Sequence, residues 1–572
     1  MKLLLTTLHA KYSHTSLALP CLASCCGDLA GVNIRIHEWT VNEPREQILR
    51  RIMREQADVV AFSCYIWNIE SSLKLSNDIK KIAPETIIVL GGPEASFGIF
   101  ELMQHNPAVD FVVKGEGEAV FHRLMETLLL PQADTGLPQT TDLFQNIDNL
   151  FFRNGNDILS GPLTSEYLTM DNIPSPFQAG LVDLSKPLIY YETSRGCPFS
   201  CAFCLSSLEG RVRSFSRQRI ESDLAWLMSR QTEQIKLVDR TFNYDAERAN
   251  RIWEFILEHN RGSRFHFEIA ADLLTDRNIT LLQQVPPNTF GFEIGVQSIS
   301  PDTLEQVQRT ADMERLAENV RRLRVETAVE LHLDLVAGLP GETYHGLLES
   351  LDIVAGLKPH VIQIEPLKVL KGSPMRKIAA RHGYRFSHFP PYTILTTPWL
   401  SFGDIVRIET IGRLLDLFYN RGGFETALCV MGKGMGFAEL FDRMADQVGE
   451  EQLSGRSTLR TYELFASLAT PLLMDQERDL LHDALFFDYC RVEMPLHGKL
   501  PGFVTERRQQ CGWPGRAELP QELELPPNGR IKAFRHEFRW DFRSDTWQEG
   551  ATEVTFVYAS AAGRGLEVRV LS

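Results

Sequence analysis

Short apolar segments alternate with helical segments in two stretches of this 572-residue chain, residues 2–130 and residues 188–365. Such alternation is typical of parallel sheets covered by helices. The helical segments include 219–231, 246–258 and 342–355. The expected strands are Lys2–Leu8, Asn33–Glu38, Val59–Ser63, Thr86–Leu90 and Phe111–Val113, then Leu188–Thr193, Ile235–Val238, Phe265–Ile269, Phe290–Gly295, Glu330–Val336 and Val361–Ile364. The pattern predicts an α/β protein with two parallel sheets.

The first five strands predict a doubly wound, Rossmann-like domain over residues 1–130. Polar or glycine-rich strings follow several of these strands, as in Gly91-Gly92-Pro93-Glu94 and Lys114-Gly115-Glu116-Gly117-Glu118. Ligands of open α/β sheets bind at this carboxyl edge, where glycines let the backbone approach a large flat cofactor. Gly91-Gly92 alone is equally well explained as a tight turn.

The six later strands predict a partial (β/α)6 barrel of the TIM type over residues 187–400. Chemistry in such barrels takes place at the carboxyl ends of the strands. Several polar side chains fall at these ends: Asp239, Glu268, Glu293, Gln297, Asp334, Gln363 and Glu365. Carboxylates in a barrel are also ordinary partners of lysine and arginine.

Two other segments complete the expected domain organisation. Residues 131–186 lose periodicity and gather Pro, Asp, Asn, Gly and Ser, which indicates a linker. Residues 401–572 form a C-terminal region that is helical over about 405–490. Apolar and polar residues then alternate strictly around Phe534, His536 and Phe538, which predicts a small antiparallel sheet at the end of the chain.

Cys197, Cys201 and Cys204 form a C-x3-C-x2-C motif directly after the first barrel strand. Three thiolates in one short loop can hold three corners of a cubic iron–sulfur cluster and leave the fourth iron open. A structural zinc site would need a fourth ligand at similar spacing, and none follows nearby. A disulfide would leave one thiol over. The motif therefore favours a cluster.

This motif, with the aromatic Phe203 before its last cysteine, resembles the signature of the radical S-adenosylmethionine (SAM) superfamily. The resemblance implies a 4Fe-4S cluster whose open iron chelates S-adenosyl-L-methionine and cleaves it to a 5'-deoxyadenosyl radical. The strings Glu293-Ile294-Gly295-Val296-Gln297-Ser298 and Gly338–Thr343 resemble segments of the same class. By this resemblance the expected SAM contacts are Glu268, Glu293 and Gln297, with Asp239 standing where many members carry Gly-Gly-Glu.

The N-terminal domain, placed before such a loop, resembles the cobalamin-binding domain of cobalamin-dependent radical SAM enzymes. The expected cofactor contacts are Ser63, Gly91, Gly92, Glu94, Gly115, Glu116 and Gly117. The loop after the first strand contains His9 and His14 but not the D-x-H-x-x-G motif. The resemblance therefore implies cobalamin in the base-off form without a histidine ligand.

The charge balance bears on the expected partners. The net charge of −15 disfavours wholesale phosphate binding, so a small molecule is favoured over RNA or a peptide as substrate. No apolar run reaches about 18 residues, so no membrane association is expected. Ten scattered cysteines argue for a reducing, cytoplasmic location. An electron donor such as flavodoxin or ferredoxin is implied by the resemblance.

The leading functional hypothesis is a cobalamin-dependent radical SAM methyltransferase that acts on an unactivated carbon or a phosphinate-like centre. A second hypothesis keeps both cofactors but replaces methyl transfer by cyclisation or rearrangement. A third is a cobalamin or redox sensor without turnover, against which a complete barrel with polar strand ends argues.

Overall fold

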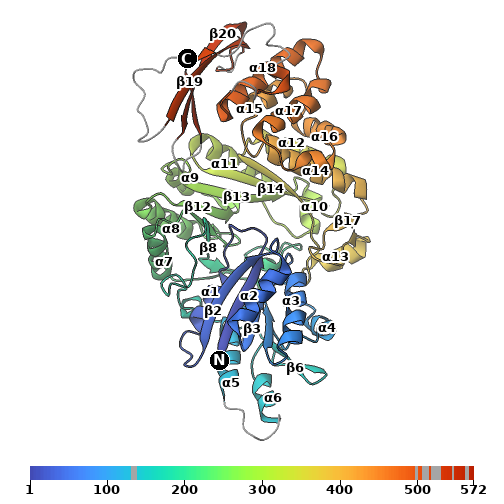
Figure 1. The fold of residues 1–572 in the computed structure, drawn as a ribbon. Helices are drawn as coiled ribbons and strands as arrows, with labels where there is room; N and C mark the ends of the chain where they lie inside the picture. Colours follow the sequence, from blue (N-terminus) through green and yellow to red (C-terminus); the bar gives the residue numbers. More distant parts are fainter. Residues whose placement is uncertain are drawn as a thin grey trace. The chain divides into compact units, whose positions relative to one another are not determined.

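The computed structural model describes residues 1–130, 138–495, 500–504, 515–516, 530–543, 547–560 and 566–571. It divides into two compact units. The first consists of Met1–Gly295, Pro301–Leu331 and Leu367–Pro398; the second consists of Val296–Ser300, His332–Pro366 and Trp399–Ser572. Figure 1 shows the mixed α/β character of the chain, which confirms the fold class expected from the sequence.

The N-terminal sheet has seven strands in the order β2-β1-β3-β4-β5-β6-β7. Its first five strands pair in parallel, whereas β6 and β7 add antiparallel to β5. The strands are β1 Lys2–His9, β2 Asn33–Thr40, β3 Val59–Ser63, β4 Ile87–Gly91, β5 Phe111–Val113, β6 Leu150–Asn154 and β7 Asp157–Ser160. The segment expected as a linker, 131–186, thus supplies two strands of this sheet, while 131–137 lie outside the described residues.

Helices cover both faces of the N-terminal sheet, as Figure 1 shows. They are α1 Ala18–Cys25, α2 Arg45–Glu55, α3 Ile69–Ile82, α4 Ile99–His105, α5 Glu118–Leu129 and α6 Pro138–Gln145. Alternate residues of one strand enter opposite cores: Leu4 and Leu8 pack in one cluster, Leu3 and Leu5 in the other. This double burial explains why the strands read as continuous apolar runs.

The second large sheet has six strands in the order β15-β14-β13-β12-β11-β8 and forms the partial barrel. The pairs β8–β11, β11–β12, β12–β13 and β14–β15 are parallel. The strands are β8 Leu188–Tyr191, β11 Gln234–Leu237, β12 Arg264–Ile269, β13 Phe290–Gln297, β14 Glu330–Ala337 and β15 Val361–Pro366. The helices of this region are α7 Arg217–Ser229, α8 Ala246–His259, α9 Asp276–Leu282, α10 Pro301–Gln306, α11 Met313–Glu326, α12 Tyr344–Gly356 and α13 Met375–His382.

The barrel strands have two unlike faces. In β13 buried and half-buried residues alternate along the whole strand, and β12 and β14 repeat the pattern. The buried side carries Phe265, Phe267 and Phe292, and the Phe267 ring contacts the other two. The other side carries polar residues, which is the face that encloses the lumen of a barrel.

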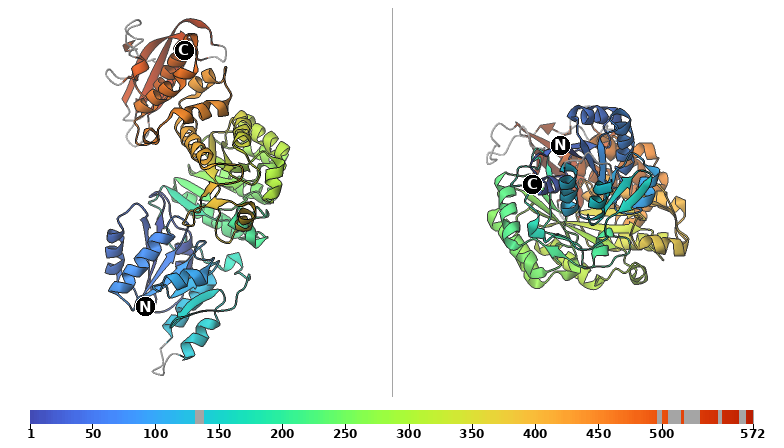
Figure 2. Two further views of the ribbon diagram at one scale, coloured as in Figure 1. Left: turned by 90° about the vertical axis from the view of Figure 1, so that its right-hand side faces the viewer. Right: turned by 90° about the horizontal axis from the view of Figure 1, so that it is seen from below.

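The C-terminal part of the second unit is helical and then β-structured, as expected from the sequence (Figure 2). Its helices are α14 Phe402–Phe418, α15 Glu425–Met431, α16 Phe437–Gln447, α17 Thr458–Ala469 and α18 Asp475–Val492. The sheet is antiparallel in the order β18-β19-β20-β21, with β18 Gly515–Arg516, β19 Arg530–Trp540, β20 Glu549–Ser560 and β21 Glu567–Leu571. None of the helices in the described part of the chain combines the length and apolar character needed to cross a membrane.

Candidate functional site

The three cysteines of the motif lie in the loop after β9 (Ser194–Arg195). Cys197 and Cys201 are buried, Cys204 is half-buried, and all three are free thiols. Burial raises the pKa of Cys201, Cys204 and Cys197 add to this effect, and the charge and hydrogen bond of Arg309 oppose it. Within the described ranges no group of three His, Cys, Asp or Glu side chains surrounds a single-ion position. Three free cysteines in one short loop suit a cluster, in which each thiolate binds a different iron.

Asp239 fastens the entry to the cysteine loop. It is fully buried, and its Oδ2 accepts a hydrogen bond from the Thr193 backbone N–H at 3.0 Å. Its Oδ1 accepts from the hydroxyls of Thr193 and Ser194, each at 2.5 Å. Arg248 Nη2 also donates to Thr193 Oγ1 at 2.5 Å. Both oxygens of the carboxylate expected to contact SAM are therefore used to hold the chain just before the first cysteine.

Backbone contacts hold the middle of the same loop. The Ala202 N–H donates to the Val307 carbonyl, and the Met375 N–H donates to the Ala202 carbonyl, both at 2.8 Å. The Ser207 hydroxyl lies within hydrogen-bond distance of the carbonyls of Cys204, at 2.7 Å, and Cys201, at 3.0 Å. A loop fixed at so many points presents its sulfurs in a preorganised geometry, as a metal site requires.

The inner face of the barrel sheet carries a cluster of charges in the first unit. Lys236 Nζ lies 2.9 Å from Glu293 Oε2 and 3.8 Å from Glu268 Oε1. His266 Nε2 lies 2.7 Å from the same oxygen of Glu293. The register explains this grouping, because Lys236 pairs with His266 and Glu268 pairs with Glu293 in adjacent strands. The lumen is thus ionic where many barrels are filled by branched apolar side chains.

The two glutamates of this cluster differ in their acidity. Burial raises the pKa of Glu268, with Arg240 and Lys236 opposing it. Burial acts in the same direction on Glu293, but the hydrogen bond with His266 and the charge of Lys236 hold its pKa well below the ordinary value. Two neighbouring carboxyls with divergent pKa values are a common feature of catalytic sites.

The carboxyl edge of the N-terminal sheet shows a close backbone approach at Gly92. Its φ of 95° lies in the left-handed region, and a Cβ there would stand 2.7 Å from the Cys64 carbonyl oxygen. Gly115 has a φ of 75°, and its N–H donates a hydrogen bond to Ser96 Oγ at 3.0 Å. Gly91 also accepts a hydrogen bond from the Cys64 N–H. The glycines of both expected cofactor strings thus stand where strand ends meet.

A stacked aromatic pair also lies at this edge, in the loop that follows β3. The rings of Tyr65 and Trp67 are parallel, with centroids 4.5 Å apart. Trp67 is 45% exposed, although its Nε1–H donates to the Leu8 carbonyl at 3.0 Å. Ser63 lies just before this pair and its carbonyl accepts from Thr7 Oγ1. An exposed aromatic beside two glycine turns suits a binding surface for a flat ligand.

Glu94 and Glu116 are the two acidic residues expected to contact the cofactor at this edge. Both form side-chain contacts with residues of the barrel region. Glu94 accepts from the Tyr392 hydroxyl and lies 2.9 Å from Lys371 Nζ. Glu116 pairs with Arg195 at 3.0 Å and with Arg213. All of these contacts lie within the first unit, and the Glu116–Arg195 pair joins the edge of the N-terminal sheet to β9, which leads into the cysteine loop.

The histidines after β1 have partners of their own. His9 is buried, and its Nε2 lies 2.8 Å from Glu38 Oε2. His14 packs edge-on against the Tyr190 ring, and burial lowers its pKa.

Two further expected site residues belong to the motif segments. Gln297, the last residue of β13, has a φ of 72°, a region that non-glycine residues seldom occupy. Phe203 is half-buried next to Cys204. Strained backbone such as that of Gln297 gathers at functional sites, where the surrounding structure enforces it.

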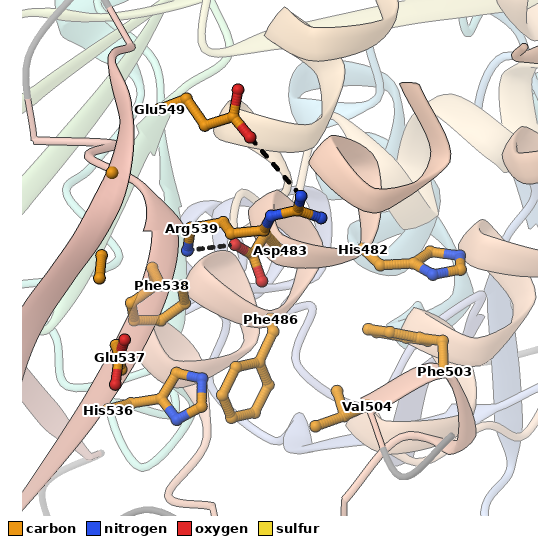
Figure 3. A pocket seen from close by; sticks show the side chains of 12 residues that line it. His482, Asp483, Phe486, Phe503, Val504, His536, Glu537, Phe538, Arg539 and Glu549 are labelled. Carbon is orange, nitrogen blue, oxygen red and sulfur yellow. Dashed lines mark hydrogen bonds and ion pairs between the residues drawn. The ribbon is translucent and has the colours of Figure 1, made fainter. Parts of the chain in front are cut away.

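A cavity of about 280 Å³ lies in the C-terminal domain, between α18 and the sheet (Figure 3). Phe486, Phe503 and Phe538 form part of its lining, together with His482, Asp483, Val504, His536, Glu537, Arg539, Glu549, Gly550 and Ala551. An irregularity of the ladder between Phe538 and Trp540 turns the Arg539 N–H toward Asp483 Oδ2, 2.7 Å away. The lining mixes aromatic rings with charges of both signs.

Three family models match successive parts of the chain. Residues 3–125 match the B12 binding domain, residues 191–354 match the radical SAM superfamily, and residues 380–513 match a protein family of unknown function, DUF4080. The matches confirm the expected order of a cobalamin-binding domain, a radical SAM domain and a separate C-terminal domain.

Curated relatives include enzymes named as methyltransferases or methylases. The chain is 26% identical over 340 residues to the cobalamin-dependent radical SAM methyltransferase TokK of Streptomyces tokunonensis, covering 56% of this chain and 48% of the relative. It is 27% identical over 313 residues to the hopanoid C-3 methylase of Methylococcus capsulatus, covering 53% and 58% respectively. The chain thus spans about half the length of these relatives.

Solved structures show a similar fold. The cobalamin-dependent SAM radical enzyme OxsB superposes with a TM-score of 0.58 at 15% identity, covering 85% of this chain and 83% of that one. The radical SAM methyltransferase TsrM of Kitasatospora setae gives a TM-score of 0.55 at 16% identity, covering 68% and 78%.

Proposed function

We propose that this chain, which joins a B12-binding domain to a radical SAM domain, is a cobalamin-dependent radical SAM methyltransferase. One observation carries the proposal. The edge of the N-terminal sheet and the cysteine loop belong to one compact unit, and Arg195 links them through Glu116 and Glu118 at 3.0 and 2.6 Å. Two cofactor sites in one unit can serve one substrate, and holding reactants together removes much of the entropic barrier.

The residues fit the proposed cofactors. Cys197, Cys201 and Cys204 would hold a 4Fe-4S cluster, and the Gly92 and Gly115 turns with the exposed face of Trp67 would hold cobalamin. When bound, the cluster would supply an electron to SAM and cobalamin would carry a methyl group.

The side chains of the chain itself perform binding and positioning in this proposal. Asp239 holds the cysteine loop, while Lys236 keeps Glu293 ionised on the inner face. An ionised carboxylate accepts hydrogen bonds from hydroxyl or ammonium groups of SAM. Glu268, whose pKa is raised by burial, is the better candidate to exchange a proton near neutral pH.

We infer that the substrate is a polar small molecule. The ionic inner face favours polar groups over a pure hydrocarbon, and the net charge of −15 disfavours RNA. The names of two relatives, the hopanoid C-3 methylase and the 2-(S-pantetheinyl)-carbapenam-3-carboxylate methyltransferase, refer to small molecules. The described cysteines are all free, which supports a reducing, cytoplasmic setting with a flavodoxin or ferredoxin as electron donor.

The proposed cobalamin is base-off and has no protein histidine below cobalt. The Glu38 partner of His9 supports this assignment, as does the packing of His14 on Tyr190. Paramagnetic resonance of the cob(II)alamin form should lack nitrogen hyperfine splitting from an axial ligand. A three-line nitrogen pattern that disappears in His9→Ala or His14→Ala would identify a histidine ligand and overturn this part of the proposal.

The activity test uses SAM labelled in its methyl group. With a strong reductant and cobalamin, the anaerobically reconstituted chain should form both 5'-deoxyadenosine and S-adenosylhomocysteine. Cys197→Ala should form no 5'-deoxyadenosine, whereas Cys429→Ala, which changes an exposed cysteine of the C-terminal region, should behave as wild type. Formation of 5'-deoxyadenosine without S-adenosylhomocysteine or labelled product would favour cyclisation or rearrangement.

A further inference from the structure

Arg309 places a permanent positive charge beside one of the three cluster cysteines. It follows α10 in the first unit, and its Nη1 lies 3.7 Å from Cys201 Sγ, within hydrogen-bond range for sulfur. Its Nη2 donates to the Gly295 carbonyl. Its buried Nε has no hydrogen-bond partner among the residues that the structure describes. This Nε–H is therefore available to a group that enters the site beside the cysteine loop.

The backbone around Arg309 keeps the side chain in this position. Its own N–H donates to the Leu304 carbonyl at 2.9 Å, which closes the turn after α10. Two residues earlier, the Val307 carbonyl accepts from Ala202 in the cysteine loop. The guanidinium and the loop are thus fastened to each other through both main chain and side chain.

Cys197 also has a side-chain neighbour, but one of another kind. Thr241 Oγ1 lies 3.4 Å from Cys197 Sγ, yet its hydroxyl donates its proton to the Arg240 carbonyl at 2.8 Å. A hydroxyl has one proton to give, so Thr241 cannot also donate to a Cys197 thiolate. Arg309 is therefore the charged donor to this part of the loop.

We propose that Arg309 is a positioning residue of the iron–sulfur cluster that donates to the Cys201 thiolate and raises the reduction potential of the cluster. Reduction adds negative charge to the cluster, and hydrogen bonds and positive charge at the sulfurs stabilise the reduced state. The guanidinium stays charged at any working pH, so its effect does not depend on protonation. The inference rests on the cluster assigned above.

The experiment is an anaerobic redox titration of the reconstituted full chain, without SAM, followed by paramagnetic resonance. Iron content is measured first. A wild-type chain that holds no iron would defeat the proposed function itself, whereas the potential of a loaded cluster tests Arg309 alone. Arg321→Gln removes the same charge from an exposed position of α11 and serves as the matched control.

Arg309→Gln should keep its cluster and shift the potential to more negative values, beyond any change in Arg321→Gln. Arg309→Lys keeps the charge but loses the planar fork, so it should shift the potential less and in the same direction. If Arg309→Gln fails to hold iron, Arg309→Lys is titrated in its place. If the iron-loaded variant that is titrated has the wild-type reduction potential, the proposal is overturned. If that variant has the wild-type potential and binds SAM more weakly, the guanidinium is assigned to SAM instead.

Discussion

The two parallel sheets of this chain place their functional residues differently. The N-terminal sheet is apolar on both faces, with Leu3 and Leu4 entering separate cores, and its polar residues gather at one edge. The barrel sheet is apolar on one face only, and its other face carries Lys236 and Glu293. Both sheets have parallel strands and helical cover. The faces that each strand buries, rather than the strand order, therefore show where a ligand can bind.

The difference between the two sheets also affects the stability of the fold. A glycine turn at a sheet edge costs little stability, because it faces away from both cores. Charges on an inner face must be paired, because unpaired charges in a low-dielectric interior are expensive. The comparison therefore predicts that substitutions on the barrel side destabilise the fold more than substitutions at the N-terminal edge.

The largest effect is expected from Asp239→Ala. The change removes three hydrogen bonds from a fully buried carboxylate and frees the entry to the cysteine loop. We expect the free energy of unfolding to fall by about 3 to 5 kcal/mol, with loss of iron. Asp239→Asn keeps one acceptor oxygen, so it should lose less stability and less iron. Urea denaturation with iron analysis measures both, and wild-type iron content in Asp239→Ala would contradict the positioning role.

Lys236→Met should have the second largest effect and lower the free energy of unfolding by about 2 to 3 kcal/mol. The change leaves Glu293 beside Glu268 without the lysine cation. The folded-state pKa of Glu293 is held below its ordinary value, so its stabilising effect is present above the unfolded pKa and is lost as pH falls through the folded pKa. The stability gap between variant and wild type should therefore begin to narrow below about pH 4 and close as the pH falls through the folded-state pKa of Glu293. Denaturation curves at neutral and acid pH measure this difference in stability. A difference that is the same at both pH values would show that the Lys236–Glu293 ion pair does not cause it.

Gly92→Ala, at the edge of the N-terminal sheet, should lower the free energy of unfolding by a smaller amount, roughly 1 to 3 kcal/mol. The added Cβ would meet the Cys64 backbone in a left-handed conformation. Gly98→Ala is the control, because Gly98 is also left-handed but has open space around its Cβ position. Cobalamin binding, followed by absorbance, should weaken in Gly92→Ala only. Equal binding in both variants would remove Gly92 from the cofactor site.

The smallest effect is expected from Gln297→Gly. Glycine adopts the φ of 72° without strain, so the second unit should gain up to about 1 kcal/mol of stability. SAM affinity should nevertheless fall if the side chain contacts the cofactor. Thermal unfolding and equilibrium dialysis separate the two effects. A stability gain with unchanged SAM binding would mean that Gln297 has only a conformational role.

Much of the fold could be predicted from periodicity, because the local pattern of apolar residues determines it. The strand Val59–Ser63 is the same in prediction and structure, and the helix at 246–258 ends one residue later in the structure. The strands β6 and β7 were missed, since their apolar character is too short and too interrupted by polar residues to stand out from a linker.

The candidate site was only partly predictable. The cysteine spacing is local and could be read directly, whereas the partners of Glu94, Glu116 and Asp239 come from distant parts of the chain. Tyr392 lies 298 residues from Glu94, and Arg309 lies 108 residues from Cys201. No spacing rule connects such pairs, because the fold alone brings them together.

The central claim is that the chain holds two cofactors at separate sites, one at the edge of the N-terminal sheet and one in the cysteine loop. The most direct test is to measure iron and cobalamin in the variant with Cys197, Cys201 and Cys204 all changed to alanine. The account predicts that this variant contains no cluster iron, against about four iron atoms per wild-type chain, and binds cobalamin at the wild-type level. Iron retained at the wild-type level, or cobalamin lost together with iron from a folded chain, would contradict it.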